Sequence, residues 1–258
     1  MGKIFPSKIE NSPLIASTAE VRLGKAVSNS LLVGKVYPAL QARYSEVSVL
    51  PASSLPEEML SKNPSLSYLP HYTLKTPGAK TAVQLGPKML ALTGEPHLRQ
   101  SDMMGELHVI LQQVEGLGLL DHVERISLRY VNLFENMSPN KCFDLSADLN
   151  GHSVIEHLSN VRFNIPIDKF SVEIICVSDA TVQDGDDFGE SEDGSASRGE
   201  RVGAVLDIEV WTNQLPSPDS SDYTIKMAEM FLEAHRIAKR TFFDSLKDEL
   251  IESLGPNK

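Results

Sequence analysis

Hydrophobic and polar residues alternate along several short stretches of the chain, and this pattern predicts a protein rich in β-strands. Successive side chains of a strand point to opposite faces of the sheet, so a period of two marks a strand with one buried face. Turn residues at Gly86-Pro87 and at 166–169 join neighbouring stretches into hairpins. The predicted strands cover residues 14–23, 43–50, 80–85, 88–93, 122–134, 160–165, 171–177 and 201–212.

Two longer segments repeat hydrophobic residues every three or four positions, which is typical of amphipathic helices. The first begins at Pro96 and runs for about twenty residues. The second runs over about 222–254 and ends at Gly255-Pro256. A shorter helix over 31–37 should end at Pro38, because proline has no N–H to continue the helical hydrogen bonds.

The order of the elements, strands followed by a helix and then strands followed by a helix again, predicts an α+β fold. We expect two similar halves, residues 1–118 and 119–258, each a mainly antiparallel sheet covered by its terminal helix. The similarity rests on element order, since the residues of the two halves show no repeat. The proline-rich residues 51–78 should form a long ordered loop with one short helix near 57–62.

The charge of the chain narrows the classes of function. Lysine and arginine number 24 against 35 acids, a formal net charge of −11. A chain of this sign lacks the field that attracts phosphate backbones, so we do not expect it to bind nucleic acid on its own. Much of the excess lies in residues 183–200, which are rich in acids, glycine and serine. We expect a mobile, solvated loop there, or alternatively a segment whose negative charge attracts a basic partner.

Targeting and redox features are those of a cytoplasmic protein. The N-terminal residues lack the apolar core of a signal peptide, and no apolar run is long enough to cross a membrane. The chain holds two cysteines, Cys142 and Cys176, which are too few for a disulfide framework. We therefore expect a protein of the cytoplasm that does not associate with membranes.

Common enzyme and metal signatures are missing from the sequence. It contains no phosphate-binding GxxxxGK[ST] loop, no GxSxG elbow and no HExxH motif. Gly116 and Gly118 are better explained by the end of a helix than by a dinucleotide loop. His152 and His157 are five residues apart, which places them on different faces of a helix or strand. We predict no metal and no cofactor, and the sequence favours a non-enzymatic role while leaving an enzyme open.

The most unusual cluster is Arg129-Tyr130-Val131-Asn132 in the predicted strand 122–134. Alternation places Arg129 on one face and Tyr130 and Asn132 on the other. Tyr130 and Asn132 could form hydrogen bonds across the seam between the two halves. A buried Arg129 would need a carboxylate partner, for which Asp207 or Glu209 on strand 201–212 is a candidate.

The last helix carries His235 on its apolar stripe and Arg236, Lys239 and Arg240 close to it. His235 is either a core residue bonded to a neighbouring strand or a catalytic base. The three basic residues form either a solvated helix face or a surface for a partner. If the chain binds a ligand, the predicted site combines the residues Arg129, Tyr130, Asn132, Asp207 and His235.

Four blocks of the sequence together resemble a sporadically distributed family of prokaryotic proteins of similar length. The blocks are Pro13–Leu23, Ile126–Phe134, Ala204–Trp211 and Phe231–Leu246. The family shares an Arg-Tyr-Ile-Asn strand, a late Asp-Ile-Asp strand and a C-terminal helix that bears a histidine. Val131 and Glu209 replace the isoleucine and the second aspartate here. The resemblance implies no established activity, cofactor or catalytic set, and the patchy distribution is similar to that of accessory genes such as defence or toxin–antitoxin components.

Three functions follow as hypotheses. The favoured one is a non-enzymatic interaction subunit of a cytoplasmic complex or oligomer, accessory to phage defence or toxin control, that binds a protein partner or a second copy of itself. The second is a protein that binds a small molecule or nucleotide, or an enzyme, at the seam of the sheet. The third is a holdase-like chaperone that holds peptides beneath the long helices.

Overall fold

The computed structural model describes residues 6, 8–96, 98–145, 148–150, 152–153, 160–183 and 200–257. His157 and the predicted acidic loop, apart from its two end residues, lie outside this part of the chain. The helices are α1 (Asn29–Leu40), α2 (Glu57–Lys62), α3 (Gln100–Glu115), α4 (Pro139–Cys142), α5 (Tyr223–Asp244) and α6 (Asp248–Ser253), with the 3₁₀ turns η1 (Pro51–Ser54) and η2 (Pro64–Tyr68).

Nine strands form one antiparallel sheet, which confirms the predicted α+β fold. The two shorter pairings are β1 (Lys8–Ile9) with β13 (Pro256–Asn257), and β8 (Asp148–Leu149) with β9 (His152–Ser153). From one edge to the other, the large sheet runs β10 (Asn160–Ile167), β11 (Phe170–Gln183), β12 (Glu200–Thr212), β7 (Val123–Glu135), β2 (Leu14–Leu23), β6 (Met89–Gly94), β5 (Thr81–Gly86), β4 (Tyr72–Lys75) and β3 (Glu46–Val49).

The pair β2–β7 joins the strands of both predicted halves into this one sheet. The strand order is similar on each side of the pair. Outward from β2 come β6, β5 and β4, and outward from β7 come β12, β11 and β10. Along the chain, each group of strands ends in a long helix: α3 follows β6, and α5 follows β12. The division of the chain into two similar halves stays a prediction.

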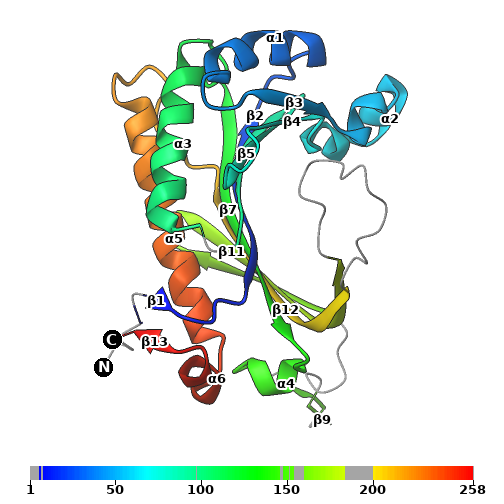
Figure 1. Ribbon diagram of the computed structural model, residues 1–258, viewed down its shortest axis with the longest axis vertical. Coiled ribbons are helices and arrows are strands. Elements are labelled where there is room, and N and C mark those ends of the chain that lie inside the picture. Colours follow the sequence, from blue (N-terminus) through cyan, green and yellow to red (C-terminus); the bar gives the residue numbers. More distant parts are fainter. Residues whose placement is uncertain are drawn as a thin grey trace.

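The two long helices pack against each other and lie along the same side of the sheet (Figure 1). The core fills the space between them and the sheet. Side chains from α3, including Leu107 and Leu111, and from α5, including Phe231 and Ala234, are fully or almost fully buried there. They meet strand residues such as Leu128, whose side chain is also buried. The helices thus cover the strand positions that the alternating pattern marks as apolar.

The predicted single helix over 222–254 is wrong, because the chain breaks between α5 and α6. Residues 245–247 leave the helix and pair instead with the segment after α4. The amide of Lys247 donates to the carbonyl of Cys142 at 3.0 Å, and Leu246 forms a bridge with Phe143. Both Leu246 and Phe143 are buried, so tertiary packing overrides a periodicity that continues through the break.

The prediction that Pro38 ends the first helix is also wrong, since α1 continues to Leu40. The ring of Pro38 replaces a hydrogen bond to the carbonyl of Gly34, and both residues lie on the exposed side of the helix. Val36 and Leu40 on the other side are completely buried. Their packing keeps the last turn helical, and the Gln41 amide closes it by donating to the Tyr37 carbonyl.

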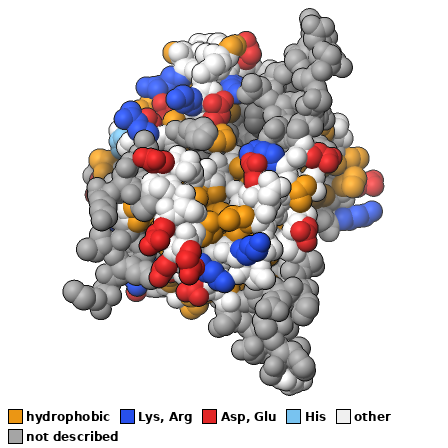
Figure 2. Space-filling view, turned by 60° about the horizontal axis from the view of Figure 1, so that its bottom comes forward, with side chains coloured by type: hydrophobic (Ala, Val, Ile, Leu, Met, Phe, Trp, Pro, Cys, Tyr) orange, Lys and Arg blue, Asp and Glu red, His pale blue; other side chains and the backbone are white. Residues whose placement is uncertain are grey.

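The surface carries charges of both signs. Acidic and basic side chains are interspersed over the face of the molecule that Figure 2 shows, with hydrophobic side chains exposed near its middle. No helix of the described residues is both long and apolar enough to span a bilayer.

Candidate ligand-binding site between the sheet and α5

The five predicted ligand-binding residues divide between the two faces of the sheet. Tyr130 and Asn132 on β7 border one cavity together with His235 on α5. Arg129 on β7 and Asp207 on β12 border a different, smaller pocket. The division follows from the alternation of side chains along a strand. The structure therefore brings Tyr130, Asn132 and His235 together and separates them from the other two.

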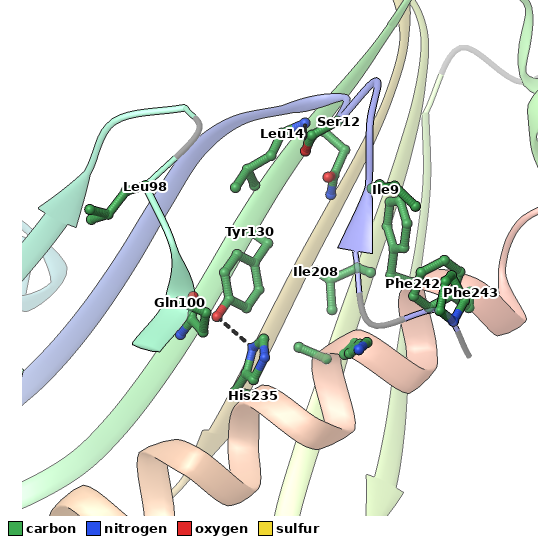
Figure 3. Close-up of a pocket in the computed structure, with 14 residues that line it drawn as sticks. Ile9, Ser12, Leu14, Leu98, Gln100, Tyr130, Ile208, His235, Phe242 and Phe243 are labelled. Atoms are coloured by element: carbon green, nitrogen blue, oxygen red, sulfur yellow. Dashed lines mark hydrogen bonds between the residues drawn. The ribbon is translucent and has the colours of Figure 1, made fainter. Parts of the chain in front are cut away.

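Tyr130 and His235 form a hydrogen-bonded pair across the space between β7 and α5 (Figure 3). The Tyr130 hydroxyl lies 2.9 Å from His235 Nδ1, and the two rings meet edge to face with centroids 5.9 Å apart. This is the bond from a core histidine to a neighbouring strand that the sequence suggests. Either atom can donate, according to the tautomer of the imidazole.

Both members of the pair are neutral at neutral pH. Burial raises the pKa of Tyr130 well above its usual value. Burial, and then the positive charges of Lys239 and Arg236, lower the pKa of His235 to about 4. The site thus offers a phenol and an uncharged imidazole, which can donate and accept hydrogen bonds.

The cavity beside this pair has a volume of about 240 Å³. It lies between β7 and β12, the start of α3, the segment leading into β2, and α5 (Figure 3). Much of its wall is apolar and comes from residues such as Ile9, Leu14, Leu98, Ile208, Phe242 and Phe243.

Gln100 brings a further polar group to the cavity, beside Tyr130 and His235 (Figure 3). Its Nε2 atom is buried and has no hydrogen-bond partner in the described part of the chain. Gln100 is the first residue of α3. Sequence reasoning missed it, because no local signal distinguishes a glutamine in the first turn of a helix; the packing of α3 against the sheet places it here.

Asn132 forms its hydrogen bond with the neighbouring strand β12 and not across the seam between the two halves. Its Nδ2 atom donates to the Leu206 carbonyl on β12 at 3.2 Å. Tyr130 bonds to His235, which also belongs to residues 119–258. The predicted hydrogen bonds from Tyr130 and Asn132 across the seam between the halves are therefore wrong, since both side chains find partners on the C-terminal side of it.

On the opposite face, Arg129 binds Asp207, one of the two carboxylate partners that the sequence suggests, through two hydrogen bonds, although the arginine side chain is exposed. Nε lies 2.9 Å from Oδ1 and Nη2 lies 2.6 Å from Oδ2. The alternative partner, Glu209, instead accepts from Arg125, whose guanidinium also stacks on the Trp211 ring. The charges on this face largely neutralise one another, so the face works as an ion-pair network.

The three basic residues predicted on α5 differ in exposure and in their surroundings. Arg236 is exposed and borders an open groove on the outside of α5. Arg240 is exposed and forms an ion pair with Asp244 at 3.4 Å. Lys239 is half-buried and borders the inner cavity. Binding of a partner by these residues stays a prediction.

The remaining reactive groups are the two cysteines. Burial raises the pKa of the Cys142 thiol to about 11 and that of Cys176 to about 12, which keeps both protonated at neutral pH. They are free thiols and are both buried. In the part of the chain that the structure describes, no three His, Cys, Asp or Glu side chains gather in a way that could hold a metal ion.

Comparisons with known proteins add no functional information. No protein-family model matches the chain, and the search of curated proteins found no match. The resemblance to the sporadic prokaryotic family therefore rests on the four sequence blocks alone.

Proposed function

We propose that this protein binds a small molecule in the cavity between the sheet and α5. One observation carries the proposal: within the described part of the chain, the buried amide nitrogen of Gln100 has no hydrogen-bond partner, and it lies beside the Tyr130–His235 pair. A buried donor without an acceptor costs about 1–3 kcal/mol. A bound acceptor would relieve that cost, and its hydrogen bond would fix the ligand in the cavity.

The composition of the wall supports the same function. Pockets for small molecules are mostly apolar, with a few polar groups that orient the ligand. Here Tyr130, His235 and Gln100 supply such groups within a wall of leucine, isoleucine and phenylalanine. An apolar cavity of about 150 Å³ can hold benzene. The cavity of about 240 Å³ has room for a single ring with one substituent.

The state of His235 favours binding over proton transfer. A base whose pKa is about 4 holds a proton weakly at neutral pH, and general bases work best with a pKa near the working pH. The imidazole and the phenol are therefore suited to orient a ligand by hydrogen bonds. We propose a binding protein without a cofactor of its own.

Protein NMR tests this function. Small ring compounds of neutral, acidic and basic type are added to the ¹⁵N-labelled protein, and shift changes are expected to centre on Gln100, Tyr130 and His235. The variant Leu14→Trp should prevent binding, because it adds bulk to a residue that borders the cavity. Leu31→Trp is the matched control, since Leu31 is exposed on α1. Absence of shift changes around the cavity for every compound would refute the proposal.

A second candidate is the interaction subunit that the sequence favours. The groove outside α5, of about 740 Å³, supports it. Leu232, which is 41% exposed, borders this groove next to charged residues such as Glu229 and Arg236. Tagged protein with Leu232→Asp should lose any partner that binds there, whereas Leu31→Asp should keep it. Equal recovery of the partner by both variants would exclude the groove.

The cellular setting is likewise a proposal. We propose that the protein works in the cytoplasm, which the two free thiols support. A role in phage defence or toxin control is supported only by the family resemblance. Deletion of the gene followed by phage challenge would test it, and unchanged phage sensitivity would count against it.

A further inference from the structure

One positive charge borders the cavity. Among the described residues that border it, Lys239 is the only one charged at neutral pH. Lys239 follows His235 by four positions, so the two lie one above the other on α5. The ammonium group has no ion pair within the described chain, and it is close enough to act electrostatically on the His235 ring. A half-buried cation that has no ion pair among the described residues, at a mainly apolar cavity, favours a negatively charged ligand.

The start of α3 adds to this preference. Gln100 borders the cavity as the first residue of a sixteen-residue helix. The first turn of a helix carries a partial positive charge, part of which the Asp102 carboxylate in the same turn offsets here. The Gln100 Nε2 atom, which has no partner in the part of the chain that the structure describes, favours the same kind of ligand, because it can only donate. The Lys239 ammonium group, the start of α3 and the Gln100 amide nitrogen therefore all favour a ligand that accepts hydrogen bonds.

The size and apolar wall limit what the ligand can be. A phosphate ester carries more charge than one lysine can neutralise, and nucleotides exceed the room available. The apolar wall instead suits a hydrocarbon body, with the charge confined to one end. A carboxylate offers two acceptor oxygens and one charge, which matches one ammonium group and the nearby donors.

We infer that the cavity binds a small monocarboxylate whose body is a single ring or a short branched chain. This inference rests on the proposed binding function and names the ligand class. The carboxylate lies towards Lys239 and Gln100, and the hydrocarbon body contacts the apolar wall that includes Leu14 and Ile208.

Two matched pairs of probes test the ligand class at pH 7: benzoate with benzamide, and isovalerate with isovaleramide. Each pair has the same shape and differs in charge. We expect each acid to bind at least about tenfold more tightly than its amide. Lys239→Gln should remove that difference. Lys35→Gln, which changes an exposed lysine on α1, should preserve it.

The outcomes separate the ligand class from the function. If the amides bind in the cavity as tightly as the acids, or if Lys239→Gln leaves the preference intact, the inference is wrong while the binding function stands. If neither the acids nor the amides nor any other ring compound shifts the signals of Gln100 and His235, the proposed function itself fails. Thermal unfolding of each variant establishes that it is folded before binding is measured.

Discussion

Arg129 holds both carboxylate oxygens of Asp207, yet the two partners differ in exposure. The arginine side chain is 53% exposed and that of Asp207 only 10%. A buried charge left without its partner costs more than an exposed one. We therefore expect Arg129→Met to lower the free energy of unfolding by about 2–3 kcal/mol, and Asp207→Asn by about 1 kcal/mol. Urea unfolding at pH 7 measures both values.

The order of the two values is the critical result. After Asp207→Asn the guanidinium still reaches solvent, and Glu209 and Glu173 remain as nearby negative charges. After Arg129→Met the three acids face one another with less compensation. Equal losses, or a larger loss for Asp207→Asn, would contradict this account. Arg99→Met is the control, because Arg99 pairs with Asp102 at an exposed site, where an ion pair contributes little.

Removal of the Tyr130 hydroxyl should destabilise the protein and leave the His235 ring without its partner. We expect Tyr130→Phe to lower the free energy of unfolding by about 1 kcal/mol, the usual value of one hydrogen bond. The imidazole ¹⁵N signals of His235 should shift at the same time. Tyr37→Phe removes a phenol bonded to the Ser45 carbonyl at an exposed site and should cost less. An unchanged His235 spectrum would show that the two side chains do not bond in solution.

The sequence identifies this pair only in part. Alternation along β7 places Tyr130 and Asn132 on one face, and helical periodicity places His235 on the buried stripe of α5. Both follow from local spacing. The contact between them depends on how α5 crosses β7, which no local pattern encodes. Gln100 is the clearer failure, since its role in the cavity arises from the position of the whole helix α3.

Strand length and flanking residues explain where prediction of the fold succeeds. The long strands β2, β7 and β12 lie where the sequence predicts strands, and the hairpin β5–β6 lies where its Gly86-Pro87 turn predicts it. The strand β4 corrects the loop predicted over 51–78: it has only four residues and lies between Pro70 and Pro77, so its sequence resembles a loop. The break after α5 was missed for the opposite reason: the apolar spacing continues through Leu246, although that residue packs against Phe143 in a different element.

Acid should weaken the fold through two histidines, the buried His71 and the partly buried His235. Burial lowers the pKa of His235 to about 4 and also lowers the pKa of His71, whose ring nitrogens have no partner in the described chain. Below the unfolded-state pKa of about 6.5, the unfolded chain takes up protons that the folded protein does not. The free energy of unfolding therefore has its full value above pH 6.5 and falls as the pH drops towards 4. We expect His235 to account for about 2 kcal/mol, reduced from the full shift because its ring is partly exposed.

Urea unfolding between pH 7.5 and 4.5 measures this dependence. His235→Asn keeps a polar atom near the Tyr130 hydroxyl but cannot titrate, so the fall in stability with acid should become shallower. His122→Asn, at an exposed position before β7, should leave the curve unchanged. A variant curve parallel to that of the unmodified protein would show that His235 does not set the acid sensitivity.

Two glycine-to-alanine changes should act in opposite directions. A methyl group at Gly86 would lie 2.2 Å from the Leu69 carbonyl oxygen, because the chain after η2 crosses the end of β5 at close range. That backbone must move away, together with the hydrogen bond from the His71 amide to the Leu85 carbonyl. We expect Gly86→Ala to lower the free energy of unfolding by about 3 kcal/mol.

Gly105 lies exposed in the middle of α3 with nothing within 4 Å of an added methyl group. There alanine should stabilise the fold by about 0.5–1 kcal/mol, since it restricts the unfolded chain and favours the helix. Thermal and urea unfolding of both variants measure whether each change stabilises or destabilises the protein. A Gly86→Ala protein as stable as the unmodified one would mean that residues 69–71 do not pack against the sheet.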